Sequence, residues 1–147
     1  MKDISQPLRD SYLAKLNTLE WPVYDEDVND TVTPWSRNDK PPAYIIITNQ
    51  SSVNNSNKCS FNSAASIQLD CITWQDGFST SKVKAEQMAN AVKELIFADN
   101  QADFSDMLPD WNVWQGRLEM DRFRIINTKT QTEVSKILII SHQVQEL

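Results

Sequence analysis

Two strand-like runs on either side of a polar stretch place the strongest constraint on how this chain folds. Residues 44–48 form a β-branched apolar run, and residues 66–73 alternate apolar with polar side chains, as in a strand with one buried face. Residues 49–62 between them are rich in Asn and Ser, so they are predicted to project into solvent or a partner as a long hairpin loop. We expect an antiparallel pair, with strand 44–48 central in its sheet.

Two segments with helical periodicity flank this pair of strands. Residues 5–19 and residues 80–97 each place apolar side chains on one stripe, the second segment most regularly. Residues 23–24 follow the first helix as a short extended piece. Two further strands, joined as a hairpin, are predicted over residues 111–127 and 134–144.

The order of these segments defines the fold class. A chain of 147 residues suits one domain, because this length buries most of its surface around a single core. We predict one α+β domain over residues 1–147. Its antiparallel or mixed β-sheet is expected to have about four strands, with two main helices packed on one face and a long hairpin loop.

The composition removes several kinds of chemistry. The two glycines, Gly77 and Gly116, cannot build a P-loop or a dinucleotide-binding turn, both of which need clustered glycines. One histidine, His142, and two cysteines, Cys59 and Cys71, are too few for a Cys/His zinc site. We therefore expect no cofactor and no metal ion.

Two acidic clusters are interpreted as solvated loops. They lie within residues 25–30 and residues 99–110. Neither follows the pattern of an EF-hand, which needs alternating oxygen ligands, a central glycine and a closing glutamate.

The charge balance and the hydropathy narrow the partners and the location. A net charge of -6 argues against a surface that binds duplex nucleic acid, since such surfaces neutralise phosphates with Lys and Arg. No apolar run approaches the roughly 18 residues that span a bilayer, so no membrane contact is expected. The first residues show no secretory signal. A reducing cytoplasm is therefore expected, with both cysteines as free structural thiols.

His142 is the one candidate for acid–base chemistry of the histidine type. It alternates with Ile140 and Val144, so all three side chains are predicted to lie on one face of the last strand. A general base needs an activated partner within hydrogen-bond reach, and no spacing in the sequence identifies one. A structural histidine is the favoured interpretation over a catalytic one.

Five residues in the first of the two closing strands are candidates for contact with a partner. Trp111 and Trp114 either lie at the centre of an oligomer interface, where aromatic residues are enriched, or pack in the core or a lid. Arg117, Arg122 and Arg124 form a local basic concentration. This concentration faces an acidic partner or a neighbouring subunit, or else Arg122 and Arg124 form the solvated face of an edge strand.

The order of the segments resembles that of a known family. After the first helix come Trp21-Pro22-Val23-Tyr24-Asp25, a polar stretch and Pro42-Ala43-Tyr44-Ile45-Ile46-Ile47. The polar loop, Ile67-Gln68-Leu69-Asp70-Cys71-Ile72-Thr73-Trp74 and an Ala-rich helix follow. Over residues 5–97 this pattern resembles the tail completion, or tail terminator, proteins of tailed bacteriophages. Residues 98–147 match in the expected pair of closing strands.

The resemblance implies a structural protein of the virion and not an enzyme. Members of that family are small α+β proteins that assemble as rings, usually hexamers, at the head-proximal end of the tail tube. There they stop tube growth and meet the neck proteins. For this chain the resemblance implies a tail terminator, or a neck or collar component, within a virion assembled in the host cytoplasm.

The same resemblance implies the partners. The chain would form a ring of its own copies, a hexamer or a dodecamer, between the neck or connector proteins and the tail-tube or tail proteins. DNA would pass through this ring without specific binding, and an acidic channel would repel its phosphates. The hairpin loop would dock onto a neighbouring ring through Val53, Asn54 and Asn55, and the sheet edges would contact other subunits.

Two alternatives from other classes stay open. One is a small cytoplasmic enzyme that uses Asp or Glu chemistry together with His142, which would need a pocket with convergent groups. The other is a monomeric adaptor domain whose sheet edge pairs with peptides.

Overall fold

A computed structural model of the chain describes two helices and five strands in the order α1, β1, β2, β3, α2, β4, β5. Their bounds are Ser5–Leu16, Val23–Tyr24, Ala43–Asn54, Asn62–Asp76, Val83–Ile96, Trp111–Asn127 and Gln131–Glu146. The residues described are 3–25, 43–54, 56, 62–76, 82–98, 108, 110–127 and 131–147. Most of the two predicted acidic loops, residues 26–30 and 99–107, lies outside them.

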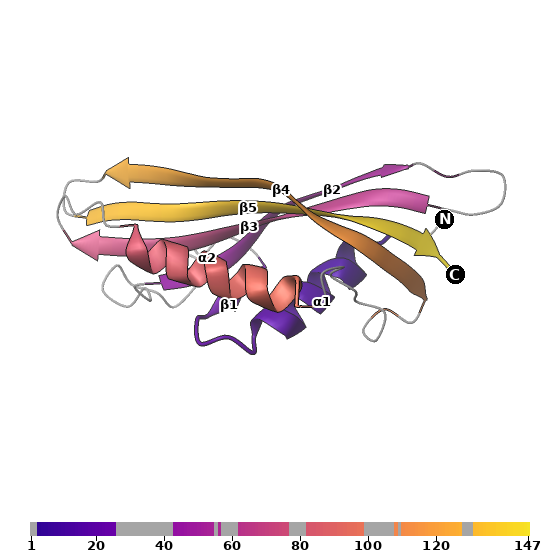
Figure 1. Cartoon of the computed structure of the whole chain (residues 1–147), viewed down its shortest axis with the longest axis horizontal. Coiled ribbons are helices and arrows are strands. Elements are labelled where there is room, and N and C mark those ends of the chain that lie inside the picture. Colours follow the sequence, from indigo (N-terminus) through magenta and orange to yellow (C-terminus); the bar gives the residue numbers. More distant parts are fainter. Residues whose placement is uncertain are drawn as a thin grey trace.

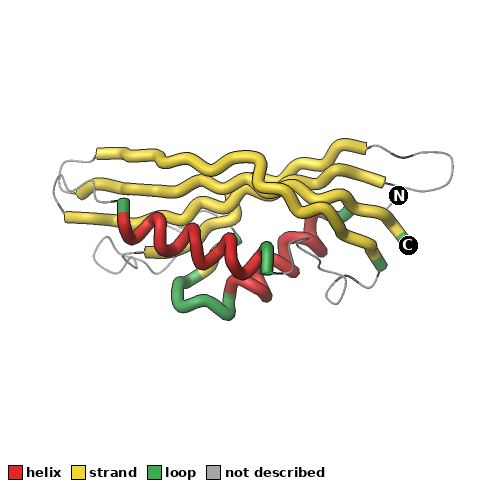
Figure 2. The backbone as a smooth tube through the Cα atoms, in the orientation of Figure 1, coloured by secondary structure: helices red, strands yellow, loops and turns green. Residues whose placement is uncertain are grey.

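The strands form one sheet in the order β1-β2-β3-β5-β4. β1 pairs parallel with β2, and the other three neighbouring pairs are antiparallel. Figure 1 shows both helices on the same side of this sheet, and Figure 2 shows the long strands running from one end of the molecule to the other. The predicted α+β class and both predicted antiparallel pairs are confirmed.

The sheet differs from the prediction in the number and order of its strands. Residues 23–24 add a fifth strand, because Val23 and Tyr24 pair with Ile45 and Ile46. The strand that contains residues 44–48 is not central, since β3 holds the middle position between β2 and β5. A strand of two residues has no periodicity to detect, and strand order is set by long-range pairing that an apolar run does not reveal.

The hairpin between β2 and β3 is also longer than predicted, and its loop is shorter. β2 continues to Asn54 and β3 begins at Asn62, so residues 49–54 form a strand instead of part of the loop. The ladder continues through these polar residues, with Gln50 opposite Ile67 and Val53 opposite Ala64. Backbone hydrogen bonds hold this part of the pair, and they do not require apolar side chains.

The main core lies between the helices and the facing side of the sheet. The stripe predicted for the second helix is buried at Ala85, Met88, Ala89, Val92 and Ile96, and its sixth residue, Leu95, is partly buried. α1 contributes Leu8, Tyr12 and Leu16, and it ends at Leu16 instead of near residue 19. The strands contribute alternate side chains: Ile45 and Ile47, Ile67, Leu69 and Cys71, and Leu138, Ile140 and Val144. Neither helix is long and apolar enough to cross a membrane.

A second, smaller cluster lies on the other face of β2 and β3. Tyr44, Ile46 and Ile72 are buried there, and Tyr24 and Trp74 pack against them. The indole N–H of Trp74 donates a hydrogen bond of 3.2 Å to the Tyr44 hydroxyl. Because residues 44–47 are buried on both faces of the strand, their sequence reads as a continuous apolar run instead of an alternating one.

Candidate functional site

The outer edge of β4 is the longest open strand edge in the described part of the chain. β4 pairs with β5 along its whole length, and no described residue pairs with its other side. Residues 117–122 and 125–127 are exposed. Four of these exposed side chains are large and apolar, with 37 to 43% of their surface accessible: Leu118, Met120, Ile125 and Ile126.

Two irregularities in β4 decide which way its side chains point. The pairing with β5 shifts register between Trp114 and Arg117 and again between Leu118 and Met120, as at β-bulges. After these shifts the three arginines share the sheet face that lies opposite the helices. Their partners in β5 alternate along that strand and are, for Arg117, Arg122 and Arg124 in turn, Ser141, Ile137 and Ser135.

Arg124 is held inside the chain by two buried carboxylates. Its guanidinium lies 3.1 Å from Glu133 and 3.6 Å from Asp70, whose side chains are 12% and 4% exposed. The hydroxyl of Ser135 donates to Glu133 at 2.9 Å, and the amide of Gln68 donates to Asp70 at 3.0 Å. Arg124 therefore neutralises charge within the sheet, and its side chain is still 39% exposed, so a contact with a partner remains a prediction.

Arg117 and Arg122 are presented at the surface instead. The side chain of Arg117 is 79% exposed and lies 3.9 Å from Glu119, an exposed pair that contributes little to stability. Arg122 is also exposed. Asp121, which lies between Arg117 and Arg122 in the sequence, points to the other face, where it contacts Lys93 of α2 and Lys136 of β5. The surface charge of the β4 edge therefore comes mainly from Arg117, Glu119 and Arg122.

Trp111 differs from the exposed arginines of β4. The side chain of Trp111 is 7% exposed and packs in the main core, which is the core alternative left open by the sequence. The side chain of Trp114 lies outside those that the structure describes. A subunit contact through this pair remains a prediction.

β2 provides a second open edge, beyond the point where β1 ends. β1 pairs only with Ile45 and Ile46, and no described residue pairs with the outer side of β2 after them. Residues 48–54 carry no charged side chain and are exposed, apart from the half-buried Gln50. Val53 is 65% exposed and Asn54 is exposed, while Asn55 lies outside the described residues.

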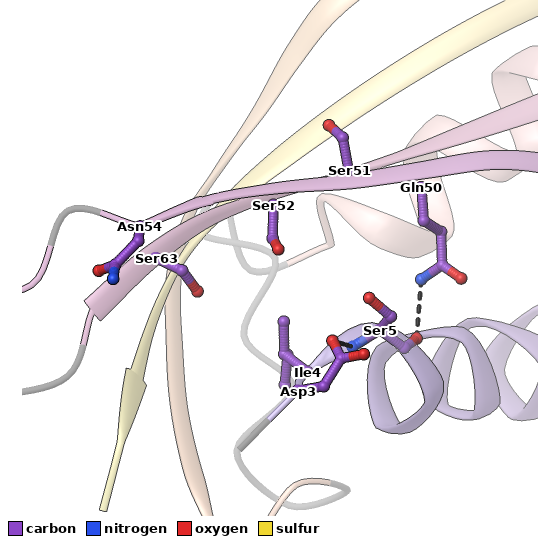
Figure 3. Close-up of a pocket in the computed structure, with 8 residues that line it drawn as sticks. All are labelled: Asp3, Ile4, Ser5, Gln50, Ser51, Ser52, Asn54 and Ser63. Carbon is purple, nitrogen blue, oxygen red and sulfur yellow. Dashed lines mark hydrogen bonds between the residues drawn. The ribbon is translucent and has the colours of Figure 1, made fainter. Parts of the chain in front are cut away.

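A polar hollow of about 530 Å³ lies between this part of the hairpin and the start of α1 (Figure 3). Its lining is mostly hydroxyl and amide groups: Ser5, Gln50, Ser51, Ser52, Asn54 and Ser63, with Asp3 and Ile4. The side-chain amide of Gln50 donates 2.8 Å to the carbonyl of Ser5, and Asp3 accepts 2.9 Å from the N–H of Ser5. The Gln50–Ser5 bond fastens the hairpin to α1, the Asp3–Ser5 bond lies within the start of the helix, and the groups offer hydrogen bonds but no acid–base pair.

His142 lies in the core on the same face as Ile140 and Val144, as predicted. Its Nε2 and the Tyr12 hydroxyl of α1 share a hydrogen bond of 2.5 Å. Burial, together with the charge of Lys15, lowers the pKa of His142 to about 4. Burial also raises the pKa of Tyr12 well above its usual value. Two neutral, fully buried groups link a helix to the sheet, which is the structural role favoured by the sequence.

Other reactive side chains in the described residues are also buried or dispersed. Cys71 is a free thiol in the core, and its burial, with the nearby charge of Asp70 and Asp121, raises its pKa to about 12. Cys59 lies outside the described residues. Within the parts of the chain that the structure describes, His, Cys, Asp and Glu side chains do not gather in threes as metal ligands.

The strongest candidate for function is therefore a pair of open strand edges. Sequence reasoning found the arginines of β4 but missed the exposed apolar residues beside them. The signal was present, because residues 118, 120, 125 and 126 place apolar side chains on both faces of one strand. The edge of β2 was missed because its polar residues were interpreted as a loop.

Comparison with known proteins supports the fold. No protein-family model matches the chain, and no curated protein matches it. The chain is similar to one in a solved structure described as the virion of a native gene transfer agent (GTA) particle, with a TM-score of 0.55 and 16% sequence identity. The match covers 97% of this chain and 91% of that chain. At this identity the likeness shows that the two chains share a fold over nearly their whole length.

Proposed function

We propose that this chain is a structural protein of a phage-like virion, a ring-forming tail terminator or neck component at the head–tail interface. The observation that carries the proposal is the fold shared with a chain of a gene transfer agent virion, which extends over 97% of this sequence. The segment order of residues 5–97, which resembles tail terminator proteins, supports the same assignment.

The open edges of the sheet support an assembly role. Natural proteins usually shield long strand edges, because exposed backbone N–H and C=O groups pair readily with other chains. Here no described residue pairs with the outer side of β4, a strand of 17 residues that exposes apolar side chains. In a subunit of a larger assembly, such an edge can pair with a strand of another chain.

The charge suits a ring around DNA. With a net charge of -6, the copies of a ring add up to a strongly negative body, which repels the phosphates of a passing duplex. In this proposal the ring joins the tail to the capsid connector and lets DNA through without holding it.

Light scattering tests the proposal. The solution mass of the wild-type protein is measured at two concentrations and two salt strengths, alone and with the neck and tail-tube proteins of the same virion. A stable mass of six or twelve times the 16.9 kDa chain, under either condition, is the expected result. A protein that stays monomeric and binds neither the neck nor the tail-tube proteins would contradict the proposal.

A monomeric adaptor domain is the second candidate, and the same open edge of β4 favours it. An extended peptide can add a strand to an exposed sheet edge, with backbone hydrogen bonds giving affinity. This candidate predicts a monomer at all concentrations that binds a β-strand peptide. The enzyme alternative receives no such support, because His142 is buried beneath α1.

A further inference from the structure

We infer that neighbouring copies of this chain join edge to edge, with the outer edge of β4 in one copy pairing with the outer edge of β2 in the next. The inference rests on the proposed function and names the surfaces that would build its ring. The occupant of each edge is a second copy of this chain.

In the described part of the chain, the sheet has two different open edges, one at β4 and one at β2. Along β4, no described residue pairs on the outer side, and along β2 none does beyond Ile45 and Ile46. Residues 49–54 and 120–127 are both mostly exposed. Each edge therefore offers a row of unpaired backbone donors and acceptors that another strand satisfies.

The directions of the two edge strands, β2 and β4, favour antiparallel pairing between copies. Three antiparallel pairings separate β2 from β4, so the two edge strands run in opposite directions within one chain. A second copy that continues the sheet with its helices on the same side therefore places its β2 antiparallel to β4 of the first. The two strands that meet at the junction then pair antiparallel, as three of the four neighbouring strand pairs in this sheet do.

The charged side chains at the two edges also favour pairing of β4 with β2. The surface charges of the β4 edge are Arg117, Glu119 and Arg122, whereas residues 48–54 of β2 are uncharged. A β4–β4 pair that sets Arg117 of each copy opposite Arg122 of the other brings like charges together, which is destabilising. Pairing β4 with β2 avoids this repulsion.

Exposed apolar side chains lie on the same face of the sheet at both edges. Met120 and Ile126 lie on the face opposite the helices, and Val53 lies on the same face of β2, as their pairing partners show. These side chains are 37%, 43% and 65% exposed in the single chain. Strand addition covers part of this surface on both copies.

Joining two unlike edges has a consequence for assembly. The contact is head-to-tail, so each added copy leaves a β4 edge and a β2 edge open at the two ends of the row. A row of this kind closes into a ring when the rotation between copies allows it. Pairing through a single edge would stop at a dimer.

Two edge variants test the inference. The β4 variant carries Met120→Lys and Ile126→Lys, and the β2 variant carries Asn49→Lys and Val53→Lys, because lysines on an edge oppose strand addition. Sedimentation velocity is run on each variant alone, and on an equal mixture, under the conditions in which the wild type assembles. Each variant alone is expected to be monomeric, and the mixture is expected to give dimers but no rings.

The mixture is the decisive sample. In it, the intact β2 edge of one variant meets the intact β4 edge of the other, which leaves one working junction per pair of chains. Dimers of the β2 variant alone would show that β4 pairs with itself and would overturn the inference. A mixture that contains only monomers would overturn it as well.

A matched control carries two lysines at exposed positions away from both edges, Val83→Lys and Gln87→Lys on α2. It is expected to assemble like the wild type. If all variants form rings, this inference fails and the proposed ring stands. If the wild type forms no ring, alone or with its partners, the proposed function fails.

Discussion

At the scale of single residues, the Tyr12–His142 pair makes stability depend on pH. The folded pKa of His142 is about 4, below the unfolded value of 6.5. Between these values the unfolded chain binds a proton that the folded chain does not, so the free energy of unfolding falls as the pH falls. The contribution is complete above about pH 6.5, is lost by about pH 4, and amounts to about 3 kcal/mol.

Replacing His142 with Gln tests this dependence. We expect the wild type to lose more unfolding free energy between pH 7 and pH 4.5 than the variant does, as measured by urea denaturation with circular dichroism. The two proteins share every other titrating group. Parallel pH profiles would show that the histidine does not carry the effect.

Arg124 and Arg122 form a matched pair on one face of one strand. Arg124→Ala removes the guanidinium that lies beside the buried carboxylates of Glu133 and Asp70, so we expect it to reduce the unfolding free energy by about 1–2 kcal/mol. Arg122→Ala removes an exposed side chain and should change the unfolding free energy by less than about 0.5 kcal/mol. Urea midpoints compare them, and equal losses would contradict a structural role for Arg124.

Cys71 is expected to be unreactive in the folded protein. Its thiol is fully buried and its pKa is raised to about 12, so almost no thiolate is present at neutral pH. In a Cys59→Ser background, a thiol reagent should label Cys71 only after denaturant is added. Rapid labelling of the native protein would contradict the burial of this residue.

At the scale of elements, periodicity predicted what lies against the core and failed where backbone pairing decides. The stripe of α2 and the alternation of residues 67–73 were correct, because both reflect burial on one side. Residues 49–54 were mistaken for a loop, since their side chains bury little. They form a strand because β3, itself paired with β5 along its length, offers them a ladder of hydrogen bonds.

The candidate site was predictable only in part, for a similar reason. The sequence shows that Arg117, Arg122 and Arg124 are close together, but not that register shifts place all three on one face. It also does not show the buried partners of Arg124, because Asp70 and Glu133 come from two other strands. Contacts between strands distant in sequence are invisible to a pattern within one segment.

Hydrogen exchange of the two edge strands tests their role in assembly. In the monomer, the outward-pointing amides of residues 49–54 and 120–127 should exchange quickly, because none of the strands that the structure describes pairs with them. On assembly these amides should become protected, while the amides of α2 keep their exchange rates. Protection that appears elsewhere and leaves both edges unchanged would contradict the edge-to-edge arrangement.

At the scale of the whole molecule, the account combines a shared fold with the surfaces that this chain leaves open. The likeness to a chain of a gene transfer agent virion extends over nearly all of the sequence, and no described residue pairs with the outer side of β4 or with the outer side of β2 beyond Ile46. His142 and Cys71 are both buried. His142 shares a hydrogen bond with Tyr12, and Cys71 is a free thiol in the core. These features suit a subunit that works by shape and contact.

Electron microscopy of the wild-type protein tests the central claim most directly. The purified protein is imaged alone and after mixing with the neck and tail-tube proteins of its virion. The account predicts closed rings with an open centre, six-fold or twelve-fold in copy number, that sit on the end of the tube when tube protein is present. Single particles of one chain in both samples, with bare tube ends, would contradict it.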